Sequence, residues 1–148
     1  NNFYSSLSKL RNLETVIIND SSFVSDTHIR LLTNSKSLKK LSLVGDDYIT
    51  NLGILFIASS QSIKSLELFL FKNINDHTIR LLSNSKTIQK LSIIQNELIT
   101  KKGIKSLSNL KTLETLVLYN LPNIDKKTIA YLQQQNPQLN INAQYLKQ

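Results

Sequence analysis

The chain has 148 residues, the length of one ordinary domain, and 41% of them are apolar, so it can bury a continuous core. It contains no cysteine, which excludes disulfide scaffolds, thiolate zinc sites and cysteine nucleophiles. The net charge of +8 favours an acidic partner or a nucleic acid only slightly, because a chain rich in Asn, Lys, Ile and Ser is also what an AT-rich genome encodes.

The start of the chain is expected to lie inside a repeating unit. Residues 1–12 lack the apolar segment of a signal peptide. Leu7 and Leu10 align with Leu107 and Leu110, which predicts that the chain begins within a helix and is a fragment of a longer chain. The longest apolar run, about Leu66 to Phe71, is too short to cross a membrane, so no membrane contact is expected.

From residue 13 the sequence repeats every 25 residues. The five full units begin at Leu13, Leu38, Ile63, Ile88 and Leu113, and Leu139 opens a partial sixth. The fourth and sixth positions are apolar in every unit, from Val16 and Ile18 to Leu116 and Leu118, which is typical of a strand with one buried face. We therefore expect a single domain with repeats of about 13–37, 38–62, 63–87, 88–112 and 113–138, and partial repeats at both ends.

A helix is expected later in each unit, where two apolar residues are spaced by three. These pairs are Ile29 and Leu32, Ile54 and Ile57, Ile79 and Leu82, Ile104 and Leu107, and Ile129 and Leu132. A residue suited to capping a helix precedes each pair: Ser25, Thr50, Asn75, Thr100 and Asp125. The third helical position is glycine or a small or polar residue, which indicates close packing against the neighbouring unit: His28, Gly53, Thr78, Gly103 and Thr128.

Two further features concern the end of the chain and the repeat itself. Asn136 to Ile141 is expected to start a last strand, and Ala143 to Gln148 to fold over it as a polar cap. The segment Ile29 to Leu32 recurs as Ile79 to Leu82, so a second repeat of 50 residues lies on top of the first.

These units resemble the cysteine-containing class of leucine-rich repeats, LxxLxLxxCxxITDxGLxxLxxxC, which occurs in the substrate-binding domains of F-box proteins. The best match is Leu38 to Ser60, with Leu41, Leu43, Ile49, Thr50, Gly53 and Ile54 in register. The two cysteine positions are replaced, the first by Ser21, Asp46, Phe71, Asn96 and Leu121, and the second by Ser35, Ser60, Ser85, Leu110 and Asn136 or a residue near it. The resemblance implies a right-handed α/β solenoid with a parallel sheet on the concave face and helices on the convex face.

The absence of cysteine also bears on location. Extracellular members of the leucine-rich-repeat family usually close their ends with disulfide-bonded caps, and this chain has none. We therefore expect an intracellular protein, in the cytoplasm.

The candidate binding surface is the outward side of the strands. Side chains alternate across a sheet, so the fifth and seventh positions point away from the core. At the seventh position Val44, Phe69, Ile94 and Tyr119 would form an apolar stripe, widened by Leu70 at the eighth position. The alternative interpretations are that such residues simply suit strands or that a loop covers them. Lysines at the second and third positions follow one edge, with glutamates at its two ends: Lys39, Lys40, Lys64, Lys90, Glu14 and Glu114.

These features predict a protein-protein interaction module whose partner has acidic character. The resemblance implies substrate recognition in an F-box type ubiquitin ligase complex. The alternatives are a structural subunit of a larger assembly and a weak nucleic-acid binder, although base stacking favours aromatic residues interleaved with arginine and the stripe has no arginine. His28, His77 and the pair Asp46 and Asp47 form no catalytic or metal-binding pattern, so we expect no enzymatic activity, no cofactor and no metal.

Overall fold

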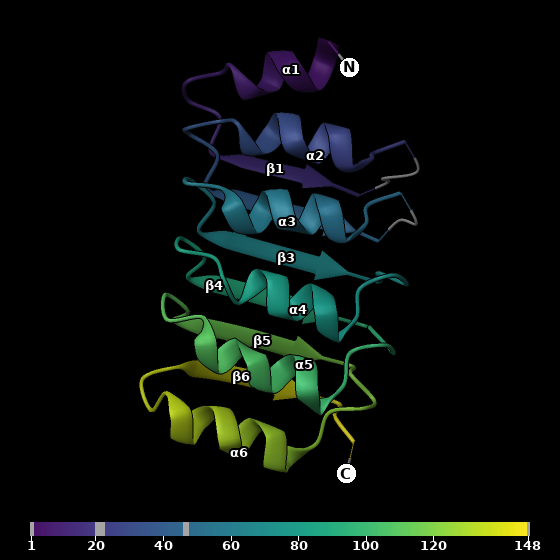
Figure 1. The fold of residues 1–148 in the computed structure, drawn as a ribbon, viewed down its shortest axis with the longest axis vertical. Coiled ribbons are helices and arrows are strands. Elements are labelled where there is room, and N and C mark those ends of the chain that lie inside the picture. Colours follow the sequence, from purple (N-terminus) through teal and green to yellow (C-terminus); the bar gives the residue numbers. More distant parts are fainter. Residues whose placement is uncertain (1, 20–22, 46–47, 148) are drawn as a thin grey trace.

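The computed structural model describes residues 2–19, 23–45 and 48–147. Within them, helices and strands alternate along the chain and form two layers, with the helices in front of the sheet in Figure 1. The strands are β1 (Thr15–Ile18), β2 (Lys40–Val44), β3 (Ser65–Phe69), β4 (Lys90–Ile94), β5 (Thr115–Tyr119) and β6 (Asn140–Gln144). The helices are α1 (Asn2–Ser8), α2 (Asp26–Thr33), α3 (Asn51–Ser59), α4 (Asp76–Leu82), α5 (Lys101–Ser106), the 3-10 helix η1 (Leu107–Asn109) and α6 (Lys126–Gln135).

The sheet follows the repeat of the sequence. Its six strands lie in chain order β1 to β6, and every neighbouring pair is parallel. Val16 pairs with Leu41, and Leu41 with Leu66, so each strand is offset by 25 residues from the one before. The predicted strand positions are confirmed, and the chain is an α/β solenoid. The acidic pair Asp46 and Asp47, considered above as a possible site, lies outside the described residues, and so does Ser21.

The core lies between the sheet and the helices. The fourth-position side chains of the central strands are fully buried, and so are the helical residues that face them: Leu41, Leu66, Leu91, Leu116, Ile29, Ile54, Ile79 and Ile104. Burying one such side chain contributes about 1.5 to 3 kcal/mol. Val16 is only half-buried because β1 forms the edge of the described sheet.

Each of the helices α2 to α6 begins directly after the predicted capping residue. The N-caps of α2 to α6 are Ser25, Thr50, Asn75, Thr100 and Asp125. Thr50, for example, accepts a hydrogen bond from the backbone N–H of Leu52 at 3.2 Å. Ser25 uses its own N–H, which donates to Nδ1 of His28 at 3.1 Å. The cap therefore determines where each helix starts.

An aspartate at the start of one helix binds the start of the next. The Asp26 carboxylate accepts hydrogen bonds from the N–H of Thr50 at 2.8 Å, its hydroxyl at 2.6 Å and the N–H of Gly53 at 2.9 Å. Two units later Asp76 accepts the same pair of bonds from Thr100, at 2.7 and 2.6 Å. A Cβ at Gly53 would overlap the Asp26 carboxylate, so the predicted close packing at this position is confirmed.

At the α3–α4 and α5–α6 interfaces, other residues replace this aspartate contact. At the α3–α4 interface, the Thr78 hydroxyl donates to Asn51 Oδ1 at 2.6 Å. At the α5–α6 interface, Lys101 forms an ion pair with Asp125 at 2.6 Å. This Lys101 contact and the hydrogen bonds from Thr128 hold the pKa of the Asp125 carboxyl well below its usual range. Two kinds of interface thus alternate along the first four units, which gives a structural reason for the 50-residue repeat.

Buried serines occupy the second cysteine position of the repeat. Ser35, Ser60 and Ser85 are each at most 4% exposed. The Ser60 hydroxyl oxygen accepts hydrogen bonds from the N–H groups of Ser62 and Ile63, both at 3.3 Å. Ser35 and Ser85 make the equivalent bonds. A hydroxyl therefore satisfies the backbone of the turn that leads into each of these strands.

The C-terminal end differs from the expected polar cap. Ala143 and Gln144 continue β6 instead of folding over it. The strand gives the backbone groups of β5 hydrogen-bonding partners, which an irregular cap would leave incomplete. Tyr145 then packs its ring against Tyr119, with the centroids 5.0 Å apart. In the described part of the chain, no helix is long and apolar enough to cross a membrane.

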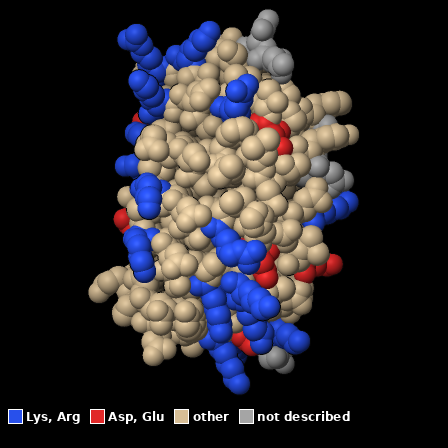
Figure 2. Space-filling view, in the orientation of Figure 1, with Lys and Arg blue, Asp and Glu red and all other residues tan. Residues whose placement is uncertain are grey.

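Charge is distributed unevenly over the helical layer. Figure 2 shows this face, with Lys and Arg gathered over its lower end, where α5 and α6 lie. The exposed cations of these two helices are Lys101, Lys102, Lys105, Lys126 and Lys127. The ammonium of Lys105 also lies 5.0 Å from the centre of the Tyr131 ring.

Candidate binding surface

An apolar row crosses the outward side of the sheet, and consists of Val44, Phe69, Ile94 and Tyr119. Each residue of the apolar row pairs directly with the next in the parallel ladder. The first three are half-buried and Tyr119 is 39% exposed. Adjacent strands lie about 4.8 Å apart, so the four side chains are in sequence across the sheet. The structure therefore brings these predicted site residues together.

The residue after each of the strands β3 to β6 has left-handed backbone geometry. The φ angles are 58° at Leu70, 53° at Gln95, 53° at Asn120 and 52° at Tyr145. The N–H of Leu70 still donates to Ile94 O at 3.0 Å, so the ladder continues for one residue before the chain turns. This conformation is costly for a residue with a Cβ, and it places Leu70 at the rim of the sheet, 49% exposed.

Gly45 occupies the same repeat position in the second unit. Its N–H donates to Phe69 O at 2.6 Å. A Cβ at this position would overlap the carbonyl group of Leu70. Only glycine allows the two turns to approach this closely.

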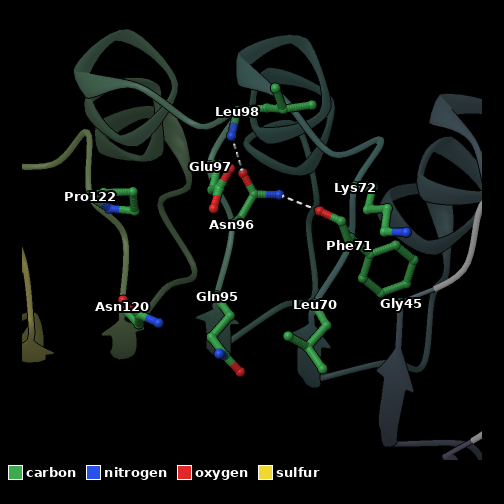
Figure 3. Close-up of a pocket in the computed structure, with 10 residues that line it drawn as sticks. All are labelled: Gly45, Leu70, Phe71, Lys72, Gln95, Asn96, Glu97, Leu98, Asn120 and Pro122. Atoms are coloured by element: carbon green, nitrogen blue, oxygen red, sulfur yellow. Dashed lines mark hydrogen bonds between the residues drawn. The ribbon is translucent and has the colours of Figure 1, made fainter.

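A groove of about 700 Å³ lies beside the apolar row. In Figure 3, Leu70, Gln95 and Asn120 lie at the ends of successive strands, and the turns that lead from there to the helices form the rest of the groove. Its remaining lining residues are Gly45, Phe71, Lys72, Asn96, Glu97, Leu98 and Pro122. The groove therefore combines exposed apolar side chains with amide groups that can hydrogen-bond to a ligand.

Asn96 organises the wall of this groove. It is only 4% exposed, and its side-chain N–H groups donate to Phe71 O at 2.7 Å and Ile74 O at 3.0 Å. Its carbonyl oxygen accepts from the N–H groups of Leu98 and Ile99, both at 2.8 Å. A single side chain thus holds two neighbouring turns in place (Figure 3).

The predicted lysine edge is partly neutralised. Lys39 pairs with Glu14 at 2.5 Å, and Lys40 pairs with Glu67 at 2.8 Å. Among the described residues, no carboxylate lies within 4.0 Å of the ammonium group of Lys64, and the same holds for Lys90. Two of the four predicted lysines therefore keep an unpaired charge beside the apolar row.

The fifth-position residues are less uniform than the alternation of a strand predicts. Ile17 is 58% exposed, but Ser42 is only 5% exposed although it also points outward. Ser42 is a short side chain paired with Ile17 on one side and with Glu67 on the other. These larger neighbours cover it, so Ser42 points outward as predicted but is not open to solvent.

The two histidines lie apart from this surface. His28 is in α2, where it bonds to Ser25 and its ring contacts the Tyr4 ring in a tilted arrangement, with the centroids 4.6 Å apart. His77 is exposed in the first turn of α4. Within the described residues, no three His, Cys, Asp or Glu side chains are grouped so that they could hold a metal ion.

Sequence reasoning identified the apolar row but missed the groove. A polar Asn96 at a position that holds Phe71 and Leu121 in adjacent units was the one available signal for a hydrogen-bonded turn. Leu70, Gln95 and Tyr145 carried no signal of their left-handed geometry, and Asn120 was the one residue of a type that adopts it readily. The Glu67 pairing was missed because the strand alternation does not indicate diagonal contacts between Lys40 and the next strand.

The stacked strand, turn and helix units, with an outward surface on the sheet, define a leucine-rich-repeat-like protein. No protein-family model matches the chain, and no curated protein matches it. The chain is similar to a chain of the yeast Rad7 and Elc1 complex, with 27% identity and a TM-score of 0.67 over 89% of its residues. It spans 38% of the length of that chain.

Two further solved structures share the fold at lower identity. The C-terminal domain of Caenorhabditis elegans tropomodulin is 15% identical, with a TM-score of 0.62, and the match covers 91% of this chain and 92% of that one. The actin-binding site 2 of leiomodin-1 is 19% identical, with a TM-score of 0.54, and the match covers 96% and 79% of the two chains. At these identities the similarity concerns the fold.

Proposed function

We propose that the chain is a protein-interaction module that binds its partner on the sheet face, through the apolar row and Leu70. The observation that carries this proposal is the direct pairing of Val44, Phe69, Ile94 and Tyr119 across four adjacent strands. Folding does not require large apolar groups at these outward positions. Their alignment favours a contact surface, with Phe69 and Tyr119 as aromatic anchors.

The surroundings of the row support a partner with acidic character. Lys64 and Lys90 have no paired carboxylate among the described residues, so they can attract acidic side chains at the edge of the contact. The groove beside Leu70 adds a recess of about 700 Å³ into which a partner side chain can extend. The buried Asn96 would make this recess rigid and so lower the cost of ordering it on binding.

The test compares two double variants in partner binding. A partner is first captured from extracts of the native cell and purified, and its affinity for the parent chain is measured by calorimetry. Phe69→Ser with Tyr119→Ser is expected to weaken binding by about 2 kcal/mol, roughly 30-fold, while unfolding free energy falls by less than about 2 kcal/mol. The matched control is Phe3→Ser with Leu10→Ser, which removes side chains that are 67% and 52% exposed at the other end of the chain. Equal binding by both double variants would reject the sheet face as the contact surface.

A more specific role is substrate recognition in an F-box type ubiquitin ligase complex, which the cysteine-containing repeat class suggests. The similarity to a chain of the Rad7 and Elc1 complex supports a role inside a multi-protein complex. An intracellular location is proposed because the chain has no cysteine for disulfide-bonded caps. Co-purification of the native protein with other ligase subunits, together with loss of ubiquitin transfer to the captured partner when the protein is depleted, is the expected result. If the native protein purifies without other ligase subunits, the ligase role is rejected and only the general role as an interaction module is kept.

A structural subunit of a larger assembly and a weak nucleic-acid binder remain the alternative functions. Two of the four edge lysines are already paired with glutamates, which counts against a phosphate-binding strip. We expect affinity for DNA or RNA to be weak and non-specific at physiological salt. Nanomolar, sequence-specific binding would favour the nucleic-acid function instead.

A further inference from the structure

Helix α3 has an apolar outer surface, unlike the helices on either side of it. It contains no charged residue, and Leu52 and Leu55 are 50% and 43% exposed. Phe56 lies half-buried beside them. We refer to Leu52, Leu55 and Phe56 as the α3 patch. Its leucines are not needed for the core, because Ile54 and Ile57 on the opposite side of the helix are fully buried.

Two arginines flank the α3 patch. Arg30 in α2 and Arg80 in α4 occupy the repeat position that Leu55 holds in α3, and both are exposed. The contacts of Asp26 with Gly53 and of Asn51 with Thr78 show that the three helices are stacked in the same phase. Packed helices lie about 8 to 10 Å apart, so Arg30, Leu55 and Arg80 form a row across the helical face. Half-buried Leu31 and Leu81 continue the apolar surface toward the two arginines.

The carboxylates of this face are already engaged. Asp26 and Asp76 accept hydrogen bonds from the next unit, and Asp125 pairs with Lys101. In residues 2–19, 23–45 and 48–147, no carboxylate lies within 4.0 Å of the guanidinium of Arg30 or Arg80. The two positive charges therefore face solvent without a counter-charge, beside an exposed apolar surface.

We propose that the α3 patch docks an acidic amphipathic segment of a partner protein, on a face separate from the sheet. Apolar side chains of the segment cover Leu52 and Leu55, and carboxylates on both sides of them bind Arg30 and Arg80. Arginine pairs with carboxylates through two parallel hydrogen bonds, which orients the segment across the helices. A helix with apolar residues at spacings of three and four and acidic residues beside them has this shape.

Charge selects this occupant over a second copy of the chain. A twofold contact between two α3 patches would bring the arginines of both copies together, and like charges at a contact cost free energy. A nucleic acid would leave Leu52 and Leu55 uncovered, and a membrane surface would have to accept two half-exposed leucines on a rigid helix, too little apolar area for stable insertion. An acidic amphipathic segment both covers the leucines and pairs with the arginines.

The first experiment determines the specificity of the surface without a known partner. A displayed library of random 16-residue peptides is selected on the parent chain, with counter-selection on a Leu52→Ser and Leu55→Ser variant. The expected result is enrichment of peptides with aspartate and glutamate beside apolar residues spaced by three and four. Enriched peptides without acidic residues, or no enrichment over the counter-selected variant, would overturn the proposal.

The second experiment measures the affinity of an enriched peptide by fluorescence anisotropy. Leu52→Ser with Leu55→Ser, and separately Arg30→Glu with Arg80→Glu, are each expected to weaken binding at least 10-fold. The matched control is Lys86→Glu with Lys111→Glu, the same charge change at exposed positions outside the α3 patch, with less than a 3-fold effect. Phe69→Ser with Tyr119→Ser on the sheet face should have no effect. Because all the helical positions changed are exposed, the melting temperatures should stay within a few degrees.

Three results would assign the surface to another occupant and reject the acidic segment. One is equal loss of peptide binding in the lysine control, which would indicate general electrostatic attraction. Another is a dimer in sedimentation that Leu55→Ser abolishes. The last is binding of the chain to phosphatidylserine vesicles that requires Leu52 and Leu55 and that the enriched peptide does not displace.

Discussion

The two faces of this solenoid use their carboxylates differently. On the sheet face, Lys39 and Lys40 are paired with glutamates, and an apolar row runs beside them. On the helical face, the aspartates are engaged in packing one unit on the next, so Arg30 and Arg80 stay unpaired. The comparison shows that one repeat can build two different surfaces, because its invariant positions form the core and its variable positions point outward.

The largest effect is expected from a substitution in the core, which would unfold the chain and so destroy both faces. Leu66→Asp places a carboxylate in the fully buried core of a central unit, where it has no partner and costs several kcal/mol. Circular dichroism is expected to show an unfolded chain at room temperature. Ile17→Asp, a carboxylate at a 58% exposed strand position, serves as the control and should remain folded. A Leu66→Asp variant that melts within a few degrees of the parent would contradict the position of the core.

The helical face can be disturbed selectively at the aspartate contacts. Gly53→Ala should lower the free energy of unfolding by about 1 to 3 kcal/mol, because its Cβ overlaps the Asp26 carboxylate. Alanine is otherwise better in a helix than glycine by about 1 kcal/mol, so the sign of the effect tests the contact. Thr27→Ala at an exposed position of α2 is the control. Chemical denaturation of the double variant Asp26→Ala and Gly53→Ala should show that the two losses are not additive.

A substitution at the edge of the sheet face is expected to raise the free energy of unfolding instead of lowering it. Gln95→Gly should raise the free energy of unfolding by about 1 kcal/mol, because glycine accepts a φ of 53° without steric cost. The same substitution at Gln89, where the backbone leads directly into β4, should lower it. Denaturation midpoints measure both. A loss of stability in Gln95→Gly would mean that its side chain contributes more than the strained backbone costs.

The smallest effect is a pH dependence at the α5–α6 interface. Lys101 and Thr128 lower the pKa of Asp125 in the folded chain, so its contribution to stability is complete above the unfolded pKa of about 4 and is lost as the pH falls through the folded pKa. The difference in melting temperature between the parent and Asp125→Asn should therefore shrink as the pH is lowered from 5 toward 2. A constant difference across this range would show that the ion pair with Lys101 does not stabilise the fold.

The sequence predicted the backbone architecture well because that architecture depends on local rules. The alternation at Val16 and Ile18 sets which side of a strand is buried, and Ser25 and its equivalents set where the helices begin. The groove could not be predicted, because it depends on left-handed turn geometry at Leu70 and Gln95, where the sequence has no glycine to indicate it. The partner of Gly53 was also hidden, because Asp26 lies 27 residues away along the chain.

The apolar row of the candidate site was predicted from strand alternation alone, and the structure shows how exposed each of its residues is. Pairing of charges between neighbouring strands was not predicted, since Lys40 reaches Glu67 by a diagonal that depends on rotamers. The burial of Ser42 has the same origin, because it depends on the size of its neighbours. Side-chain geometry across repeats therefore limits what a single sequence shows about a surface.

The alternation of interfaces makes a pair of units, and not a single unit, the module by which such a chain can lengthen or shorten. Removing 25 residues would place Asp26 opposite Thr78, whose Cβ stands where the carboxylate needs a glycine. Removing 50 residues would place it opposite Thr100 and Gly103, the groups that pack around Asp76 in the present structure. Recombination that removes these two units would therefore preserve the aspartate contact, and related chains should differ in length by multiples of about 50 residues.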